Sequence, residues 1–340
     1  MRIGISFDGF LPFWETVELA QRAVEAGAGG LWMAEHLGYR QSLVCCTAFA
    51  LQTPKAVVVP TAVSPFMWHP MSIAMALTTM DEAAPGRAAI ALGTGNPMFL
   101  QENGIAIEKP VRVMREFVEA VRGLLTGDAV EYQGETLQLA GARMMFTPAA
   151  TIPIYVAAMG EQMLKLTGRI GDGIVLSAGL SADYAHRSLG LVAEGARNAG
   201  RDYDTLRKAA YIYTAVSDDG KSAITALRSK LAWVMRNKFI TANVEASGID
   251  IDLDAIRAAI AKRDMDEATR LVPEEAVAAF ACGGTLADCR RRLEEYVAAG
   301  VEEPVLVLVG DGAEREKPLA LIKELTGELP ARSINATVTT

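Results

Sequence analysis

A glutamate, a histidine and an aspartate stand where they could move protons. Glu35 and His36 are adjacent, and an imidazole exchanges protons near neutral pH while a neighbouring carboxylate can orient it. Asp8 is a second carboxylate that could assist. The alternatives are a histidine satisfied by backbone groups at His36 and a turn-forming role for Asp8. Because both segments directly follow predicted strands, we favour catalysis by His36, assisted by Glu35 or Asp8.

Two segments of small residues could bring the backbone close to a ligand. In Gly93-Thr94-Gly95-Asn96 the paired glycines would let the backbone approach a flat ring or a phosphate, or would only form a tight turn. Ala158-Met159-Gly160 precedes a predicted helix, whose free N–H groups suit a phosphate. Neither segment is a G-x-G-x-x-G fingerprint, so a Rossmann dinucleotide fold is not expected.

Eight short apolar runs position these segments, and helix-like sequence follows each run. Most runs are continuously apolar, which is typical of parallel strands covered on both faces. Eight such units predict an α/β fold of the (β/α)8 TIM-barrel type, with the chemistry at the carboxyl ends of the strands. The predicted strands are Ile3–Phe7, Gly30–Ala34, Ala56–Pro60, Ala88–Leu92, Pro153–Ala157, Gly173–Ser177, Ala209–Ala215 and Pro304–Val309.

The 340 residues fit one barrel domain that spans residues 1–330, followed by a flexible tail at 331–340. Two stretches depart from the repeat and are predicted to be insertions on the barrel rim. The first covers about residues 126–152 and resembles a small hairpin, with strands at Ala129–Gln133 and Thr136–Leu139. The second covers about residues 217–282, is rich in helix, and could be a lid or an oligomer contact.

Composition limits the classes of partner. The net charge of −8 argues against binding to nucleic acid or to an acidic membrane surface. We see no apolar stretch long enough to span a membrane and no signal-peptide pattern, so a cytoplasmic location is expected. The spacing of the four cysteines does not match a metal site or a redox pair, and buried, reduced thiols are expected instead: Cys45, Cys46, Cys282 and Cys289.

Taken together, the motifs resemble the bacterial luciferase-like superfamily over roughly residues 1–310. Within it the chain looks most like the deazaflavin branch, which includes methylenetetrahydromethanopterin reductases and the deazaflavin-dependent glucose-6-phosphate and alcohol dehydrogenases. The matching segments are Ala26-Gly27 with Leu31-Trp32-Met33-Ala34-Glu35-His36, His69-Pro70 with Ala76–Asp81, Gly86-Arg87 with Ala91–Gly95, and Pro153–Ala158 with Gly168–Gly173.

The resemblance implies a barrel that holds coenzyme F420, or alternatively FMN, near the carboxyl ends of the strands. A bulge around Ala62-Val63-Ser64, with a non-prolyl cis peptide, would stand behind the ring. The turn Ala158-Met159-Gly160 and the backbone of Gly173-Ile174 would bind the phosphate-bearing tail. His36 would lie beside the reacting ring, and a homodimer is expected by analogy.

The dehydrogenases of this branch carry a glutamate after the glycine pair, where this chain has Asn96, and a tryptophan near the position of Tyr39. Asn96 cannot act as a general acid, so sugar or alcohol oxidation in their manner is not expected. We therefore predict hydride exchange between F420 and a small organic substrate. The alternatives are an FMN-dependent monooxygenase fed by a partner reductase and a non-catalytic protein that binds a flavin or deazaflavin.

Overall fold

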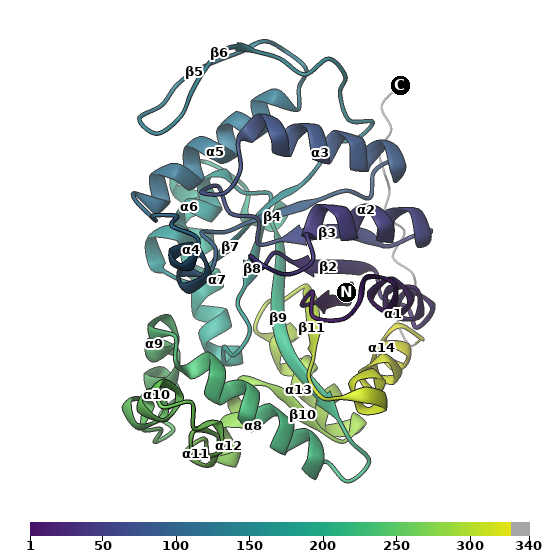
Figure 1. Cartoon of the computed structure of the whole chain (residues 1–340), viewed down its shortest axis with the longest axis vertical. Coiled ribbons are helices and arrows are strands. Elements are labelled where there is room, and N and C mark those ends of the chain that lie inside the picture. Colours follow the sequence, from purple (N-terminus) through teal and green to yellow (C-terminus); the bar gives the residue numbers. More distant parts are fainter. Residues whose placement is uncertain (328–340) are drawn as a thin grey trace.

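Eight parallel strands form a nearly closed barrel in the computed structural model, which describes residues 1–327 (Figure 1). The order around the barrel is β3-β2-β1-β11-β9-β8-β7-β4. Each of the eight predicted strands is confirmed, with ends that differ by at most two residues. The strands are β1 Gly4–Phe7, β2 Gly30–Ala34, β3 Val57–Thr61, β4 Ile90–Leu92, β7 Ile154–Ala158, β8 Gly173–Leu176, β9 Arg207–Val216 and β11 Glu303–Leu308.

The barrel closes between β3 and β4 through two isolated bridges. Val58 pairs with Ala88 below the end of β3, and Val63 pairs with Leu92 above it. Between them the peptide bond from Thr61 to Ala62 is cis. The predicted bulge with a non-prolyl cis peptide is therefore present, and the cis bond lies at its start.

Helices cover the outside of the barrel. Their inner faces carry apolar side chains three or four residues apart; in α5, for example, Met114, Phe117 and Val121 are all buried. The covering helices are α1 Phe13–Glu25, α2 Ser42–Gln52, α3 Pro70–Ala83, α5 Pro110–Leu124, α6 Glu161–Ile170, α7 Ala182–Asn198, α13 Leu286–Ala298 and α14 Pro318–Gly327. One short helix, α4 Pro97–Glu102, follows β4 and was not predicted from the sequence.

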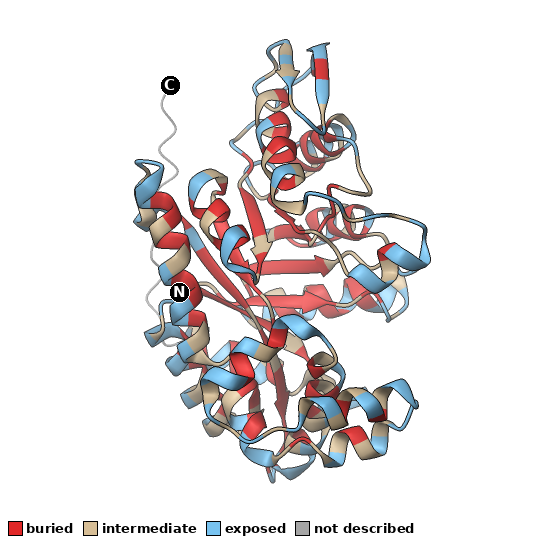
Figure 2. Cartoon of the chain, turned by 90° about the vertical axis from the view of Figure 1, so that its left-hand side faces the viewer, coloured by how far each residue is buried: buried red, intermediate tan, exposed pale blue. Residues whose placement is uncertain are grey.

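Two apolar layers result, one inside the barrel and one between the strands and the helices. Figure 2 shows that the barrel strands are almost entirely buried. Inside, the rings of Trp32 and Tyr155 meet edge to face with centroids 5.3 Å apart. The Trp32 indole N–H donates to Glu303 Oε1 at 3.0 Å, and Arg2 pairs with the same carboxylate. The lower part of the barrel is thus filled, which leaves the carboxyl-terminal end of the strands as the place for a ligand.

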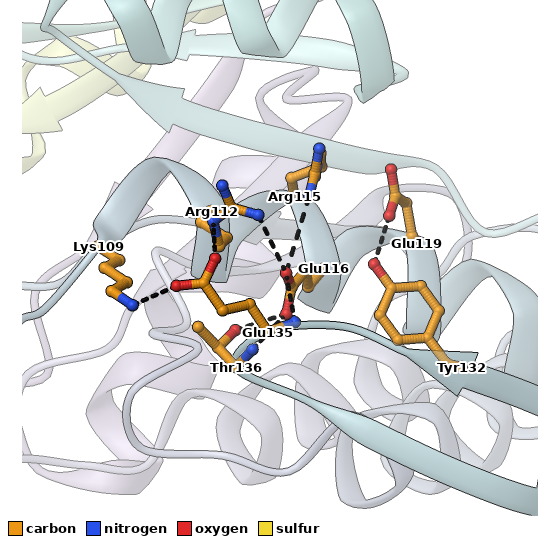
Figure 3. Close-up of polar contacts among 8 residues, drawn as sticks. All are labelled: Lys109, Arg112, Arg115, Glu116, Glu119, Tyr132, Glu135 and Thr136. Atoms are coloured by element: carbon orange, nitrogen blue, oxygen red, sulfur yellow. Dashed lines mark hydrogen bonds and ion pairs between the residues drawn. The ribbon is translucent and has the colours of Figure 1, made fainter.

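The first insertion is the predicted hairpin. Strands β5 Val130–Gln133 and β6 Gln138–Ala142 pair antiparallel beside α5. The buried carboxylate of Glu116 on α5 accepts hydrogen bonds from the amides of Glu135 and Thr136 and from the Thr136 hydroxyl, at 2.7–3.1 Å (Figure 3). One buried acid therefore fixes the turn of the hairpin to the helix.

The second insertion is helical, as predicted. It contains α8 Lys221–Met235, a short 3₁₀ turn at Lys238–Ile240, α9 Thr241–Ser247, α10 Leu253–Ala261, α11 Met265–Arg270 and α12 Glu274–Phe280. Two further 3₁₀ turns, Tyr203–Thr205 and Gly312–Glu316, lie outside the insertion. Its end differs from the prediction, because Cys282–Gly284 forms a short strand, β10, that pairs with the end of β9. The pairing extends the sheet beyond the barrel wall.

All four cysteines are buried and unpaired, as expected. Within residues 1–327 no helix is long and apolar enough to cross a membrane. The predicted tail at 331–340 lies outside the described residues.

Candidate functional site

Small side chains form one wall of the barrel mouth. A Cβ atom added to Gly93, just after β4, would lie 2.7 Å from the Ala62 Cβ and 3.3 Å from the Ala157 Cβ. The three residues therefore pack directly against one another, and each lies at the carboxyl end of its strand. A surface without large side chains suits the close approach of a flat ring.

The bulge after β3 is fixed to the loop after β4. The amide of Val63 donates to the Ala91 carbonyl at 2.9 Å, and the amide of Gly93 donates to the Val63 carbonyl at 3.1 Å. The hydroxyl of buried Ser64 donates to the Thr94 carbonyl at 3.1 Å. The structure thus brings Val63, Ser64, Gly93 and Thr94 together, as the sequence predicted.

His36 lies at the same end of the barrel, after β2. Its ring is surrounded by those of Phe10, Tyr39 and Phe99, with centroids 5.8–6.3 Å away. Within residues 1–327 no protein group hydrogen-bonds to its ring nitrogens, so both remain accessible to a ligand. Burial lowers the pKa of His36 below 6.5; Lys230 lowers it further, while Asp8 and Glu35 oppose the shift. The imidazole is therefore neutral at pH 7.

Glu35 and Asp8 are both near His36, but each is already engaged. The Glu35 carboxylate accepts from the Ser42 amide at 3.0 Å and from the Trp68 indole at 3.3 Å. Asp8 forms an ion pair with Arg315 at 3.0 Å and accepts from the Phe10 amide. Both carboxylates hold structural donors, an arrangement that suits the assisting role beside His36 that the sequence predicts.

A small pocket opens between the ends of β2, β3 and β4. It is lined by Glu35, Ala62, Ser64, Gly95 and Asn96, among others. The Asn96 side chain accepts from the Met98 amide at 3.0 Å and so caps α4. Asn96 therefore lies at the predicted site, but its oxygen is committed to the helix.

The predicted phosphate turn also lies at the mouth. Ala158 ends β7, Met159 follows, and Gly160 is the N-cap of α6. A Cβ atom added to Gly160 would meet nothing within 4 Å, so the amino end of the helix is open. Unpaired N–H groups there attract an anion.

The prediction for Gly173 and Ile174 needs correction. Both lie at the start of β8, paired with Arg207 and Lys208 at the start of β9. A Cβ atom added to Gly173 would come within 2.5 Å of the Tyr155 ring. Since a strand rises about 3.3 Å per residue, the mouth is about 10 Å away, near Leu176. Gly173 and Ile174 therefore pack in the lower barrel and do not reach the predicted cofactor site.

Sequence reasoning missed two cationic groups near His36. Lys230, on α8, has its ammonium 5.3 Å from the centre of the Tyr213 ring of β9, and Arg315 reaches Asp8 from the 3₁₀ turn after β11. Neither stands next to a motif along the chain. Only folding of the second insertion over the barrel end places Lys230 here, so no local signal could have identified it.

A flavin or deazaflavin fits these residues. The wall of Gly93, Ala62 and Ala157 would accept a flat ring, and the open end of α6 at Gly160 would accept a phosphate. His36 would face the ring from the other side of the mouth. The structure is therefore a TIM barrel with a candidate cofactor site at the carboxyl ends of its strands.

The chain belongs to the luciferase-like monooxygenase family, whose pattern matches residues 4–303. It is 31% identical over 337 residues to a 5,10-methylenetetrahydromethanopterin reductase from Archaeoglobus fulgidus, covering 97% of this chain and 100% of the relative. It is 32% identical over 229 residues to an F420-dependent glucose-6-phosphate dehydrogenase from Mycolicibacterium smegmatis, covering 63% of this chain and 68% of the relative.

The solved structures agree with this assignment. The coenzyme F420-dependent tetrahydromethanopterin reductase from Methanopyrus kandleri superposes with a TM-score of 0.87 at 26% identity, covering 95% of this chain and 97% of the other. An F420-dependent secondary alcohol dehydrogenase shares the fold, with a TM-score of 0.78 at 21% identity and coverage of 95% and 98%. The chain is thus a luciferase-like oxidoreductase, and its relatives include F420-dependent enzymes.

Proposed function

We propose that this protein transfers a hydride between coenzyme F420 and a small organic substrate. The observation that carries the proposal is the mouth of the barrel, where Gly93, Ala62 and Ala157 form a low wall and His36 stands with free ring nitrogens. Methylenetetrahydromethanopterin reductases match nearly the full length of the chain, and a solved reductase named as coenzyme F420-dependent shares its fold over 95% of the chain. When bound, the deazaflavin supplies a ring carbon that gives or accepts a hydride.

The residues of this chain contribute orientation and an acceptor for one proton. The bulge at Val63 and Ser64 is held rigid by its hydrogen bonds to the loop after β4, so it can fix a ring in one plane. His36 is neutral at pH 7, the form that accepts a proton when a hydride leaves a substrate carbon. Glu35 holds the start of α2 and the Trp68 loop, and thereby the segment that carries His36.

Equilibrium binding followed by anaerobic turnover tests the proposal. Purified protein is titrated with F420 and with FMN, and cofactor fluorescence is followed. We expect tight binding of F420. His36→Ala should retain that binding and slow hydride transfer by about 10²- to 10⁴-fold, the usual contribution of general acid–base catalysis.

His69→Ala is the matched control, because His69 caps α3 through its Nδ1 and the Met71 amide, at 3.2 Å. It removes a histidine without touching His36. A His36→Ala variant that turns over at the parental rate with intact cofactor binding contradicts the role of His36. Cofactor binding without turnover on any candidate substrate would favour a non-catalytic binding protein.

The second candidate is an FMN-dependent monooxygenase, which the activity in the name of the luciferase-like monooxygenase family favours. A reduced flavin forms an adduct with oxygen, whereas a deazaflavin lacks N5 and does not form this adduct. The two candidates therefore differ in their need for oxygen and for a partner reductase. Tight binding of FMN with no binding of F420, and product formation only in air, would replace the first proposal with this one.

A further inference from the structure

The second insertion brings a lysine without an ionic partner to the barrel mouth. Leu227 and Leu231 on α8 are fully buried and anchor the helix. Lys230 directly precedes Leu231 in the chain. Its ammonium is 5.3 Å from the centre of the Tyr213 ring, at the upper end of β9. Within residues 1–327 Lys230 forms no ion pair, although the side chain is largely withdrawn from solvent.

Two arginines lie around the same point, and each has an unused donor. Arg236, at the end of α8, stacks on the Trp233 ring at 3.8 Å, and its Nη1 is buried without a partner. Arg315 pairs with Asp8, but its Nε is buried without a partner. A buried donor that lacks an acceptor costs free energy, which an incoming acceptor would remove.

The charges at this end of the barrel do not balance. Burial lowers the pKa of Lys230, and Arg315 and Arg236 lower it further, while Asp8 alone opposes them. The charged groups that act on Lys230 are therefore two cations, Arg315 and Arg236, and one carboxylate, Asp8. This local excess of positive charge is notable in a chain whose net charge is −8. A desolvated cluster of one sign attracts a ligand of the other sign.

We propose that Lys230, Arg236 and Arg315 form a subsite that binds an oxyanion, a carboxylate or a phosphate, carried by the substrate. The inference rests on the proposed function, because it assigns a substrate class to the same barrel mouth. The cofactor tail is the other possible source of such a group. We assign the subsite to the substrate because it lies beside β9 and β1, whereas the open end of α6 follows β7, on the far side of β8.

Inorganic phosphate titrated into the full-length protein without cofactor tests the subsite directly. Binding is followed by calorimetry and by the fluorescence of Trp233, which contacts Arg236. We expect saturable binding that weakens at least about tenfold in Lys230→Gln and in Arg236→Gln, since each loses a charged donor. Lys230→Arg should retain binding. Lys221→Gln, an exposed lysine on the same helix, is the matched control and should bind like the parent.

Two further measurements separate the sources of the anion. The F420 affinity of Lys230→Gln should equal that of the parent; a parallel loss would transfer the subsite to the cofactor tail and overturn the substrate assignment. With an anionic substrate, Lys230→Gln should raise KM about tenfold and leave kcat nearly unchanged. Absence of saturable phosphate binding, or equal binding by parent and both glutamine variants, refutes the subsite. Because the phosphate titration needs no turnover, it can succeed or fail independently of the hydride-transfer proposal.

Discussion

At the scale of single residues, the barrel mouth separates groups that hold the structure from groups that can meet a ligand. The carboxylates of Glu35 and Asp8 accept hydrogen bonds or form an ion pair within the protein, and Asn96 caps a helix. His36 keeps its ring nitrogens free, and Lys230 keeps its ammonium free within residues 1–327. Substitutions of the first group should therefore affect stability, and those of the second group should affect catalysis or binding.

The pH dependence of catalysis should follow His36. Because burial lowers its pKa below 6.5, the neutral imidazole persists to mildly acidic pH. For oxidation of the substrate, kcat/KM should stay level from alkaline pH down to 6.5 and decline below it, as the imidazole becomes protonated. The measurement is the pH profile of kcat/KM, with His36→Gln as comparison; the variant should lack this decline.

The same group links folding to pH. The folded state binds fewer protons than the unfolded state between the lowered pKa and 6.5. The free energy of unfolding should therefore fall as the pH drops through this window, and it should fall less in His36→Gln. If kcat/KM of the parent protein declined with a midpoint above pH 6.5, the argument that burial lowers the pKa of His36 would be contradicted.

The amino end of α6 offers a substitution that separates stability from affinity. Gly160→Asp supplies a better N-cap in open space, so the melting temperature should hold or rise. The added carboxylate should repel the phosphate of the cofactor and weaken F420 binding about tenfold. Gly160→Asn has the same shape and capping ability without the charge, and it should bind F420 like the parent. Equal binding by the aspartate variant would place the phosphate elsewhere.

At the scale of elements, the periodicity of apolar residues and the positions of turn residues predicted most of the strands and helices. The eight strands and the hairpin were found because apolar runs and turn residues are local signals. α4 was missed although Asn96-Pro97 is a helix-start pattern, because its six residues are too few to show a period. β10 was missed because Cys282-Gly283-Gly284 has no strand pattern and forms only by pairing with the end of β9.

The site was predicted less completely for the same reason. His36, Ser64, Gly93 and Gly160 follow strands and are recognisable from their place in the chain. Gly173 was assigned to the site through the resemblance, although the predicted strand Gly173–Ser177 begins at this residue. The register with β9 confirms that it lies at the lower end of the barrel. Lys230 depends on how a long insertion folds back, which no short pattern encodes.

The hairpin should depend on one buried carboxylate. Glu116→Gln replaces an anion that accepts three hydrogen bonds from the hairpin turn, and hydrogen bonds to a charged group contribute about 1.5–3 kcal/mol (Figure 3). We expect a loss of stability of about that size in urea unfolding at neutral pH. Glu119→Gln, on the exposed face of the same helix, should cost less than about 1 kcal/mol.

The effect of Glu116 should also depend on pH. Burial raises the pKa of its carboxyl, but the hydrogen bonds from Thr136 and Glu135 outweigh burial and bring it below 4.5. Its contribution is therefore complete above 4.5 and is lost as the pH falls through the folded-state pKa. The stability difference between the parent and Glu116→Gln should shrink in that acidic range, and a constant difference would contradict the assignment.

At the scale of the whole molecule, α2 and its two neighbouring helices expose several large apolar side chains. α2 contains no charged residue, and its outward side presents Val44 and Leu51 at 61% and 65% exposure. Trp14 on α1 and Met75 on α3, the two neighbouring helices, are also exposed. A helix that is apolar all round is normally buried, so this face predicts contact with another surface.

We expect that surface to be a second copy of the chain. A homodimer places α2 against its own counterpart, so one apolar stripe covers the other without a need for complementary charge. The double substitution Val44→Glu with Leu51→Glu puts four like charges into such an interface and should yield monomers. Their melting temperature should fall only by the contribution of the lost dimer contact. Val297→Glu, on the exposed side of α13, is the matched control and should leave the dimer intact. Light scattering after size-exclusion chromatography measures the masses. A parent protein that elutes with the mass of one chain, or a double variant that stays dimeric, would remove α2 from the interface.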